Sequence, residues 1–258
     1  MSTILFDSPI FGPVHSRRLG VSLGINLLPA DGKVCSFDCI YCECGFNKDF
    51  RTKSKLPARE EVRIALEHKL KEMCSNGPAP DVLTFAGNGE PTLHPHFAEI
   101  IGDTLALRDK YVPDAKVSVL SNAAHINRPA VFEALNRVDN NILKLDTANE
   151  GYIRLLNRPV ANYSLPEVIK HLKAFGGNCI IQTLFLKGTH NGKDVDNTSD
   201  AYVLPWIKTI KEIAPRQVMI YTIERETPGH DLRKATREEL DRIVSLLMRE
   251  GIYATASY

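Results

Sequence analysis

The sequence predicts an α/β fold in a single domain, a partial and open (β/α)6 barrel that is TIM-like. Two observations predict it: short β-type runs alternate with longer helical stretches about six times, and the chain has 258 residues. Such alternation is typical of a parallel sheet with crossover helices. A closed eight-unit barrel takes about 250 residues without a lead-in segment, so six units fit this length better.

The first unit begins with an apolar stretch at 21–28, which we expect to form a strand. A cysteine-rich loop and a basic segment with Lys48, Arg51, Lys53 and Lys55 follow it. After this segment apolar residues recur at helical spacing, which predicts a helix that begins near residue 57 and ends at 76–77.

The other five units repeat the order of a short apolar run and an amphipathic stretch. No internal repeat, low-complexity tract or linker divides the chain, so 1–258 is expected to be one domain, with a lead-in and first strand over 1–30 and a loop over 31–56. The predicted strands lie at 82–86, 117–120, 142–145, 179–186 and 218–223, and the predicted helices at 97–110, 129–138, 165–175, 201–213 and 236–250.

Charge and hydropathy exclude several classes of protein. Lys and Arg total 32 against 31 Asp and Glu, so the net charge of +1 gives no global basic field, although a local basic patch can exist. The first thirty residues lack the order of a signal peptide, and no apolar run reaches the roughly 18 residues that span a bilayer. We therefore expect a cytoplasmic protein with no membrane partner, in which six cysteines do not form a disulfide framework.

The cysteines Cys35, Cys39 and Cys42 form the pattern C-x3-C-x2-C directly after the first predicted strand. Thiolates this close are expected to share one ion or cluster, and thiolates select zinc or iron–sulfur. Structural zinc usually takes four protein ligands, often as two C-x2-C pairs, and the sequence has no second pair. Three ligands suit a four-iron cluster with one open iron.

This pattern, with the aromatic Tyr41 before the last cysteine, resembles the radical S-adenosylmethionine (SAM) superfamily. Residues 11–42 further resemble a branch related to the wyosine-forming tRNA enzymes. The resemblance implies two cofactors, a 4Fe-4S cluster held by the three cysteines and SAM, and it places the backbone of Tyr41 against the adenine.

The turn Gly87-Asn88-Gly89-Glu90 follows the second predicted strand. Glycines let a backbone approach a ligand closely, and a carboxylate can balance an ammonium group. The turn resembles the superfamily's GGE-type motif, which implies that it holds the amino group of SAM, with Asn88 in place of a glycine. An ordinary Gly-Pro turn is the competing interpretation.

Further polar residues follow or interrupt the later strands. Ser121 and Asn122 end the third strand, where the resemblance implies contact with the ribose or carboxylate of SAM, or where they cap a turn. Strand alternation places Lys144 and Asp146 on one face, either to bind SAM or as a structural ion pair. Gln182 interrupts the fifth strand and is a weaker SAM-binding candidate.

Three other cysteines and a pair of arginines complete the candidates. Cys44 is expected to be a residue of the cluster loop rather than a fourth ligand, and Cys74 and Cys179 to be structural, as buried free cysteines commonly are. Arg17 and Arg18 are suited to a phosphate or carboxylate of the substrate, or belong to a solvated face.

The resemblance implies an enzyme of oxidoreductase or transferase type that reductively cleaves SAM to a 5′-deoxyadenosyl radical, which abstracts hydrogen from a substrate. It implies an external one-electron donor such as flavodoxin or ferredoxin. The substrate stays open between a tRNA base, a small metabolite and a peptide. The alternatives are a glycyl-radical activating enzyme and a non-catalytic zinc-braced binding module.

Overall fold

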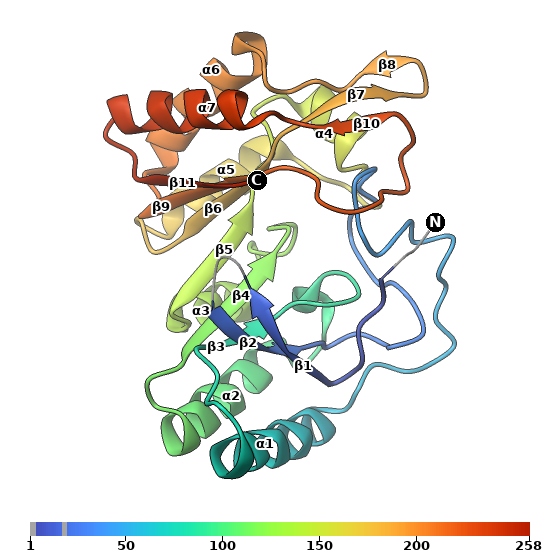
Figure 1. Cartoon of the computed structure of the whole chain (residues 1–258), viewed down its shortest axis with the longest axis vertical. Coiled ribbons are helices and arrows are strands. Elements are labelled where there is room, and N and C mark those ends of the chain that lie inside the picture. Colours follow the sequence, from blue (N-terminus) through green and yellow to red (C-terminus); the bar gives the residue numbers. More distant parts are fainter. Residues whose placement is uncertain (1–3, 17–19) are drawn as a thin grey trace.

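The computed structural model describes residues 4–16 and 20–258, and its centre is an open, eight-stranded sheet. The sheet order is β1-β2-β3-β4-β5-β6-β9-β11, so β1 and β11 are edge strands of the described sheet (Figure 1). β1 is antiparallel to β2, and every other neighbouring pair is parallel. The strands are β1 (Ile10–Ser16), β2 (Gly20–Ile25), β3 (Val82–Phe85), β4 (Lys116–Ser121), β5 (Asn140–Lys144), β6 (Ile180–Leu184), β9 (Gln217–Tyr221) and β11 (Ala254–Ser257).

The predicted partial barrel is confirmed, because the six expected strands are neighbours in one parallel and open sheet. The sequence patterns missed both edges. The Gly12-Pro13 pair interrupts any strand pattern in β1, and the small residues of β11 carry no apolar run.

The predicted strand at 179–186 was too long. It divides at Phe185 into β6 and β7 (Leu186–His190), and β7 belongs to a second, antiparallel sheet with β8 (Lys193–Asp194) and β10 (Leu232–Lys234). The sequence pattern does not separate the two strands, because the residues on both sides of Phe185 are apolar and buried. Hydropathy therefore does not mark the change of sheet.

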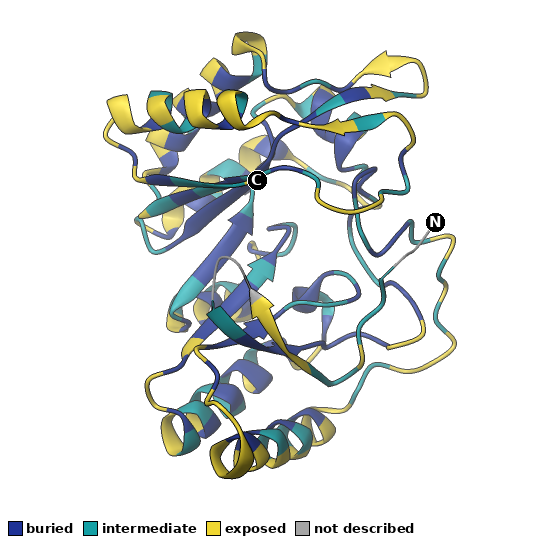
Figure 2. Cartoon of the chain, in the orientation of Figure 1, coloured by how far each residue is buried: buried dark blue, intermediate teal, exposed yellow. Residues whose placement is uncertain are grey.

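Each of the six predicted helices is present, and their exposed sides face solvent (Figure 2). One more, α4, was missed because it is short; the Asn149 side chain caps its start by accepting a hydrogen bond from the Tyr152 amide at 3.0 Å. In the described residues, no helix is both long and apolar enough to cross a membrane. The helices are α1 (Arg59–Asn76), α2 (Phe97–Tyr111), α3 (Pro129–Arg137), α4 (Glu150–Leu156), α5 (Leu165–Ala174), α6 (Asp200–Ile213) and α7 (Arg237–Arg249), with a 3-10 turn at Pro91–Leu93.

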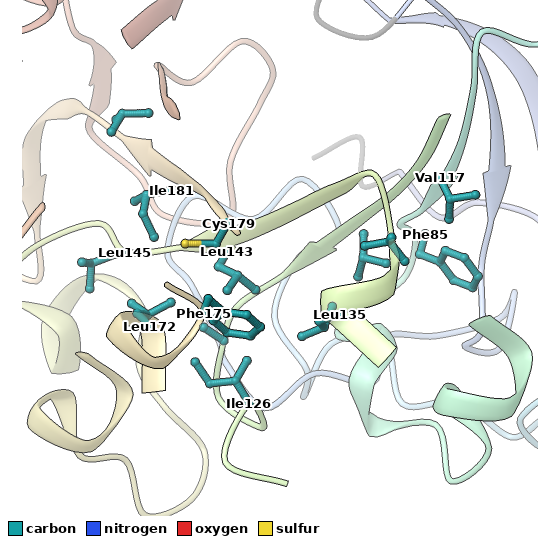
Figure 3. Close-up of a cluster of buried hydrophobic side chains, with 14 of the residues drawn as sticks. Phe85, Val117, Ile126, Leu135, Leu143, Leu145, Leu172, Phe175, Cys179 and Ile181 are labelled. Carbon is teal, nitrogen blue, oxygen red and sulfur yellow. The ribbon is translucent and has the colours of Figure 1, made fainter. Parts of the chain in front are cut away.

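The core lies between the sheet and these helices. Leu143 of β5 and Ile181 of β6 pack with helix residues such as Leu172, and Phe175 follows α5 in the same cluster (Figure 3). Cys179 is fully buried in this cluster, as expected for a structural cysteine.

Candidate functional site

A cavity of about 330 Å³ opens at the carboxyl ends of the parallel strands. Its wall includes residues that follow β2, β3, β4 and β9, and residues within β5 and β6. Parallel strands place their following loops at one edge, which is why residues distant in sequence meet here. The sequence-predicted residues in the wall are Cys35, Cys39, Tyr41, Cys42, Gly87, Gly89, Glu90, Ser121, Asn122, Lys144 and Gln182.

The cysteine loop is held on one side by the turn at 87–90. The Val34 amide donates to the Asn88 carbonyl at 2.9 Å, and the Glu90 amide donates to the Val34 carbonyl at 3.0 Å. A Cβ on Gly89 would lie 1.8 Å from the Val34 oxygen, and φ at this position is +136°. The approach therefore requires glycine.

The other side of the loop is held by the end of α4. The Ile40 amide donates to the Leu156 carbonyl at 3.0 Å, and the Asp38 amide donates to the Asn157 carbonyl at 3.0 Å. The loop thus lies between the turn at 87–90 and the end of α4, and its three cysteines line the same cavity.

Two side-chain amides donate to the cysteine sulfurs. Asn122 Nδ2 lies 3.6 Å from Cys35 Sγ, and Asn157 Nδ2 lies 3.6 Å from Cys39 Sγ. Hydrogen bonds of this kind tune the reduction potential of an iron–sulfur cluster. Asn122 therefore faces the cluster loop as well as the cavity.

The fit of the cysteines to a cluster follows from their donor chemistry and shared wall. Thiolates are the protein ligands of four-iron clusters, and each binds one iron. Cys35, Cys39 and Cys42 lie in one cavity wall, so their chemistry and placement fit such a cluster.

Lys33 places a buried positive charge beside these thiols. Its side chain is 1% exposed, and Nζ donates to the Gly45 carbonyl at 2.6 Å and lies 3.8 Å from Asp38. Burial alone would lower the pKa of Lys33, but the charges of Cys42, Cys35 and Cys39 outweigh burial and raise it. Lys33 is thus within electrostatic reach of all three cysteines.

The thiols differ in how readily they ionise. Burial raises the pKa of Cys39 to about 11 and also raises that of Cys35. A hydrogen bond with Cys44 lowers the pKa of Cys42 to about 6, with help from Lys33 and against the effect of burial. Cys35 and Cys39 must therefore lose their thiol protons when they bind iron as thiolates.

Cys44 is buried in the same wall, and its Sγ lies 3.6 Å from the Gly87 carbonyl. It therefore bridges the cluster loop and the turn at 87–90. Cys74 differs from the expectation of a buried cysteine, because its side chain is exposed near the end of α1 and contacts the Tyr111 carbonyl at 3.4 Å.

Glu90 is a buried carboxylate at the cavity wall. It accepts hydrogen bonds from Ser121 Oγ at 2.8 Å, the Asn122 amide at 2.7 Å and Thr92 Oγ1 at 2.6 Å. Burial raises its pKa, and these hydrogen bonds oppose the rise. The ends of β3 and β4 thus build one anionic position that a cationic ligand group would stabilise.

Lys144 and Asp146 lie on one face, as alternation predicts, and form an ion pair at 3.7 Å. Lys144 Nζ also donates to the Tyr221 hydroxyl at 2.9 Å and lies 5.2 Å from the centre of the Tyr41 ring. The ion pair of the competing interpretation is present, and SAM binding by these two side chains stays a prediction. Lys144 still reaches the cavity wall.

Asp146 and Asn88 are turned away from the cavity. Asp146 accepts hydrogen bonds from Tyr41, Asn157 and the Leu184 amide. Asn88 bonds to the backbone of residues 6 and 29. Their side chains therefore support the site without lining it. Arg17 and Arg18 lie outside the described residues.

Lys33, Asn157 and Phe6 are site residues that sequence reasoning missed. Lys33 stands two residues before the first cysteine, which was the available signal. Asn157 and Phe6 follow no predicted strand, so nothing in the sequence placed them near the cysteines.

Comparison with known proteins identifies the family. A profile of the radical SAM superfamily matches residues 31–201, which includes the cysteine loop, the turn at 87–90 and the ends of β4, β5 and β6. Members of this superfamily use a 4Fe-4S cluster and SAM. The matched region is the part of the chain that builds most of the cavity wall.

The chain also resembles curated proteins along most of its length. It is 30% identical to the UPF0026 protein slr1464 of Synechocystis, covering 85% of this chain and 77% of that protein. It is 29% identical to a protein of Brachyspira hyodysenteriae named GTPase Obg, covering 90% of this chain and 32% of that one. The chain thus spans about a third of the Brachyspira protein.

Solved structures share the fold at low sequence identity. A radical SAM methyltransferase from Sphaerobacter thermophilus superposes with a TM-score of 0.66 at 16% identity, over 92% of this chain and 66% of that one. SuiB of Streptococcus suis bound to SAM gives 0.60 at 15% over 88% and 46%, and archaeal TYW1 gives 0.53 at 12% over 88% and 71%. These likenesses show a shared fold, and the profile match over residues 31–201 shows that the chain belongs to the radical SAM superfamily.

Proposed function

We propose that this protein is a radical SAM enzyme in which Cys35, Cys39 and Cys42 hold a 4Fe-4S cluster beside bound SAM. The observation that carries the proposal is that these three thiols share one cavity with Glu90. A redox centre and an anionic position for an ammonium group thereby face one another across a space of about 330 Å³.

The residues of the chain divide the work of binding. Glu90 attracts the cationic amino group of SAM. The Ser121 hydroxyl and the Asn122 backbone amide hold the Glu90 carboxylate in place. The glycines at 87 and 89 let the backbone approach the ligand. Lys144 supplies a positive charge in the cavity wall, where a ligand carboxylate would be favoured.

A cluster held by the three cysteines would supply one electron for the cleavage of SAM to methionine and a 5′-deoxyadenosyl radical, which would take a hydrogen atom from the substrate. The protein's contribution is to orient SAM and to exclude water and oxygen. An external one-electron donor such as flavodoxin or ferredoxin must supply the electron.

The substrate is the finer part of the proposal. The mouth of the cavity carries an ion pair of Arg225 with Glu43 at 2.7 Å, and Thr227 lies in the same wall. Polar and charged groups of both signs suit a polar substrate. Among the structural neighbours, SuiB has been solved with a precursor peptide, so a peptide is one substrate class to test. A tRNA base and a small metabolite are the other two.

The test is anaerobic reconstitution with iron and sulfide, followed by reduction in the presence of SAM. We expect a brown protein with broad visible absorption that releases 5′-deoxyadenosine. Replacing Cys35, Cys39 or Cys42 with serine should abolish both, whereas Cys74→Ser should preserve both because Cys74 is exposed on α1.

Retained SAM cleavage in all three serine variants would overturn the proposal. A colourless protein that binds zinc tightly through the same cysteines would instead support the binding module. Formation of a radical on an added glycyl-radical enzyme would identify an activating enzyme.

A further inference from the structure

Residues 4–9, termed here the N-terminal segment, lie against the cavity in this structure. The ring of Phe6 is half-buried and forms part of the cavity wall. Phe6 stands more than twenty residues before the cluster loop, and no sequence pattern connects it with the site. Its place therefore depends on the groups that hold the segment.

Asn88 holds Phe6 through both of its backbone groups. The Phe6 amide donates to Asn88 Oδ1 at 2.8 Å, and Asn88 Nδ2 donates to the Phe6 carbonyl at 2.9 Å. Asn88 Nδ2 also donates to the Pro29 carbonyl at 2.8 Å. The Asn88 side chain is fully buried, and its hydrogen bonds to Phe6 are partly shielded from water.

A second buried amide supports the same segment. Asn26 Nδ2 lies 3.2 Å from the carbonyls of both Phe6 and Asp7. The backbone amide of Asn26 donates to the Pro9 carbonyl at 2.9 Å, and the backbone carbonyl of Asn26 accepts from Ser8 Oγ at 3.0 Å. The end of β2 therefore fixes the segment along its length.

The segment also contacts the cluster loop. The Ile4 amide donates to the Glu43 carbonyl at 3.1 Å, one residue after Cys42. The Phe6 ring packs on the ring of Phe11 at a centroid distance of 4.6 Å, and the Phe11 ring in turn fills the space that Gly24 leaves open. One short segment thus joins the cluster loop to the turn that carries Glu90.

We propose that the N-terminal segment is a wall of the SAM site, that Phe6 contacts the bound SAM, and that Asn88 is the positioning residue that holds it there. This inference rests on the proposed function. It accounts for Asn88 in a turn where the related motif has glycine: glycine would leave the backbone of Phe6 without these partners.

The test compares Asn88→Gly and Phe6→Ala in the full-length protein after cluster reconstitution. The measurements are the dissociation constant for SAM, visible absorption of the cluster and amide hydrogen exchange of a peptide covering residues 4–9. The matched controls are Asn141→Gly, a buried amide outside the cavity wall, and Phe132→Ala, a half-buried ring that stacks on Phe175.

We expect both site variants to keep the cluster absorption and to weaken SAM binding by about tenfold, the effect of losing one aromatic contact. Only Asn88→Gly should speed exchange at residues 4–9. The double variant should bind SAM no more weakly than Asn88→Gly alone, because both changes remove the same contact.

Unchanged exchange in Asn88→Gly, or wild-type SAM affinity in Phe6→Ala, would overturn the inference. If Asn88→Gly fails to take up the cluster, Phe6→Ala decides the matter. A reconstituted wild-type protein that does not bind SAM overturns the proposed function itself, and the inference with it, before any variant is compared.

Discussion

Tyr41 and Asp146 connect the cysteine loop to the end of β5 through a hydrogen bond from the Tyr41 hydroxyl to the Asp146 carboxylate. The two residues are 105 positions apart in sequence, and both side chains are buried. Asn157 donates to the same carboxylate at 2.7 Å. This contact fixes the loop between Cys39 and Cys42.

Replacing Asp146 with alanine should destabilise the protein by about 3–5 kcal/mol, because it leaves Lys144 without its buried partner. Tyr41→Phe removes two hydrogen bonds, the one to Asp146 and the one that the hydroxyl accepts from Asn157 Nδ2 at 2.9 Å, and should cost about 1–3 kcal/mol. Both free energies of unfolding can be measured by denaturant titration of the cluster-free protein. The exposed Glu238→Gln variant should match the wild type. If Asp146→Ala has the wild-type free energy of unfolding, the contacts of Asp146 with Tyr41 and Lys144 do not hold the loop.

Replacing Lys33 with methionine should make the midpoint potential of the cluster more negative. Reduction adds negative charge, and a buried cation nearby stabilises the reduced form. A lost interaction of about 1.4 kcal/mol corresponds to about 60 mV for one electron. Redox titration followed by electron paramagnetic resonance measures the shift, with the exposed Lys170→Met as control. A lowered stability with an unchanged potential would give Lys33 a structural role alone.

Replacing Gly89 with alanine should prevent cluster uptake. The new Cβ would overlap the Val34 carbonyl at 1.8 Å and break the pairing between the cluster loop and the turn. Iron content after reconstitution measures the loss. Gly102→Ala in α2 is the control, since its Cβ would meet no atom closer than 3.8 Å and alanine favours helix. Normal iron content in Gly89→Ala would contradict the structure of this contact.

SAM binding should strengthen as pH rises through the pKa of Glu90. Burial raises this pKa, so the free protein holds Glu90 neutral up to a higher pH than an exposed glutamate, and only the carboxylate attracts the SAM ammonium. The SAM dissociation constant of the wild type, measured across pH, should therefore show a step. The Glu90→Gln variant should lack this step and should bind SAM more weakly at every pH. The exposed Glu133→Gln should keep the step. A step that persists in Glu90→Gln would assign it to another group.

Much of the fold was readable because local patterns decide it. Alternating short apolar runs and amphipathic stretches predict a parallel sheet with crossover helices, and each predicted helix and strand region is present. The edge strand β11 was not readable, because its four small residues are recruited by pairing with β9 rather than by their own hydropathy. Pairing between distant segments has no local signature.

The candidate site divides in the same way. The sequence by itself predicted the candidate residues Cys35, Cys39, Cys42, Glu90, Ser121, Asn122 and Lys144, which line one cavity, because donor chemistry and spacing are local properties. Only the tertiary structure decided that Asn88 faces the N-terminal segment, that Asp146 holds Tyr41, and that Lys33 lies beside the thiols. A buried polar side chain takes the partner that folding brings within reach, and that partner is set by the packing of the whole chain.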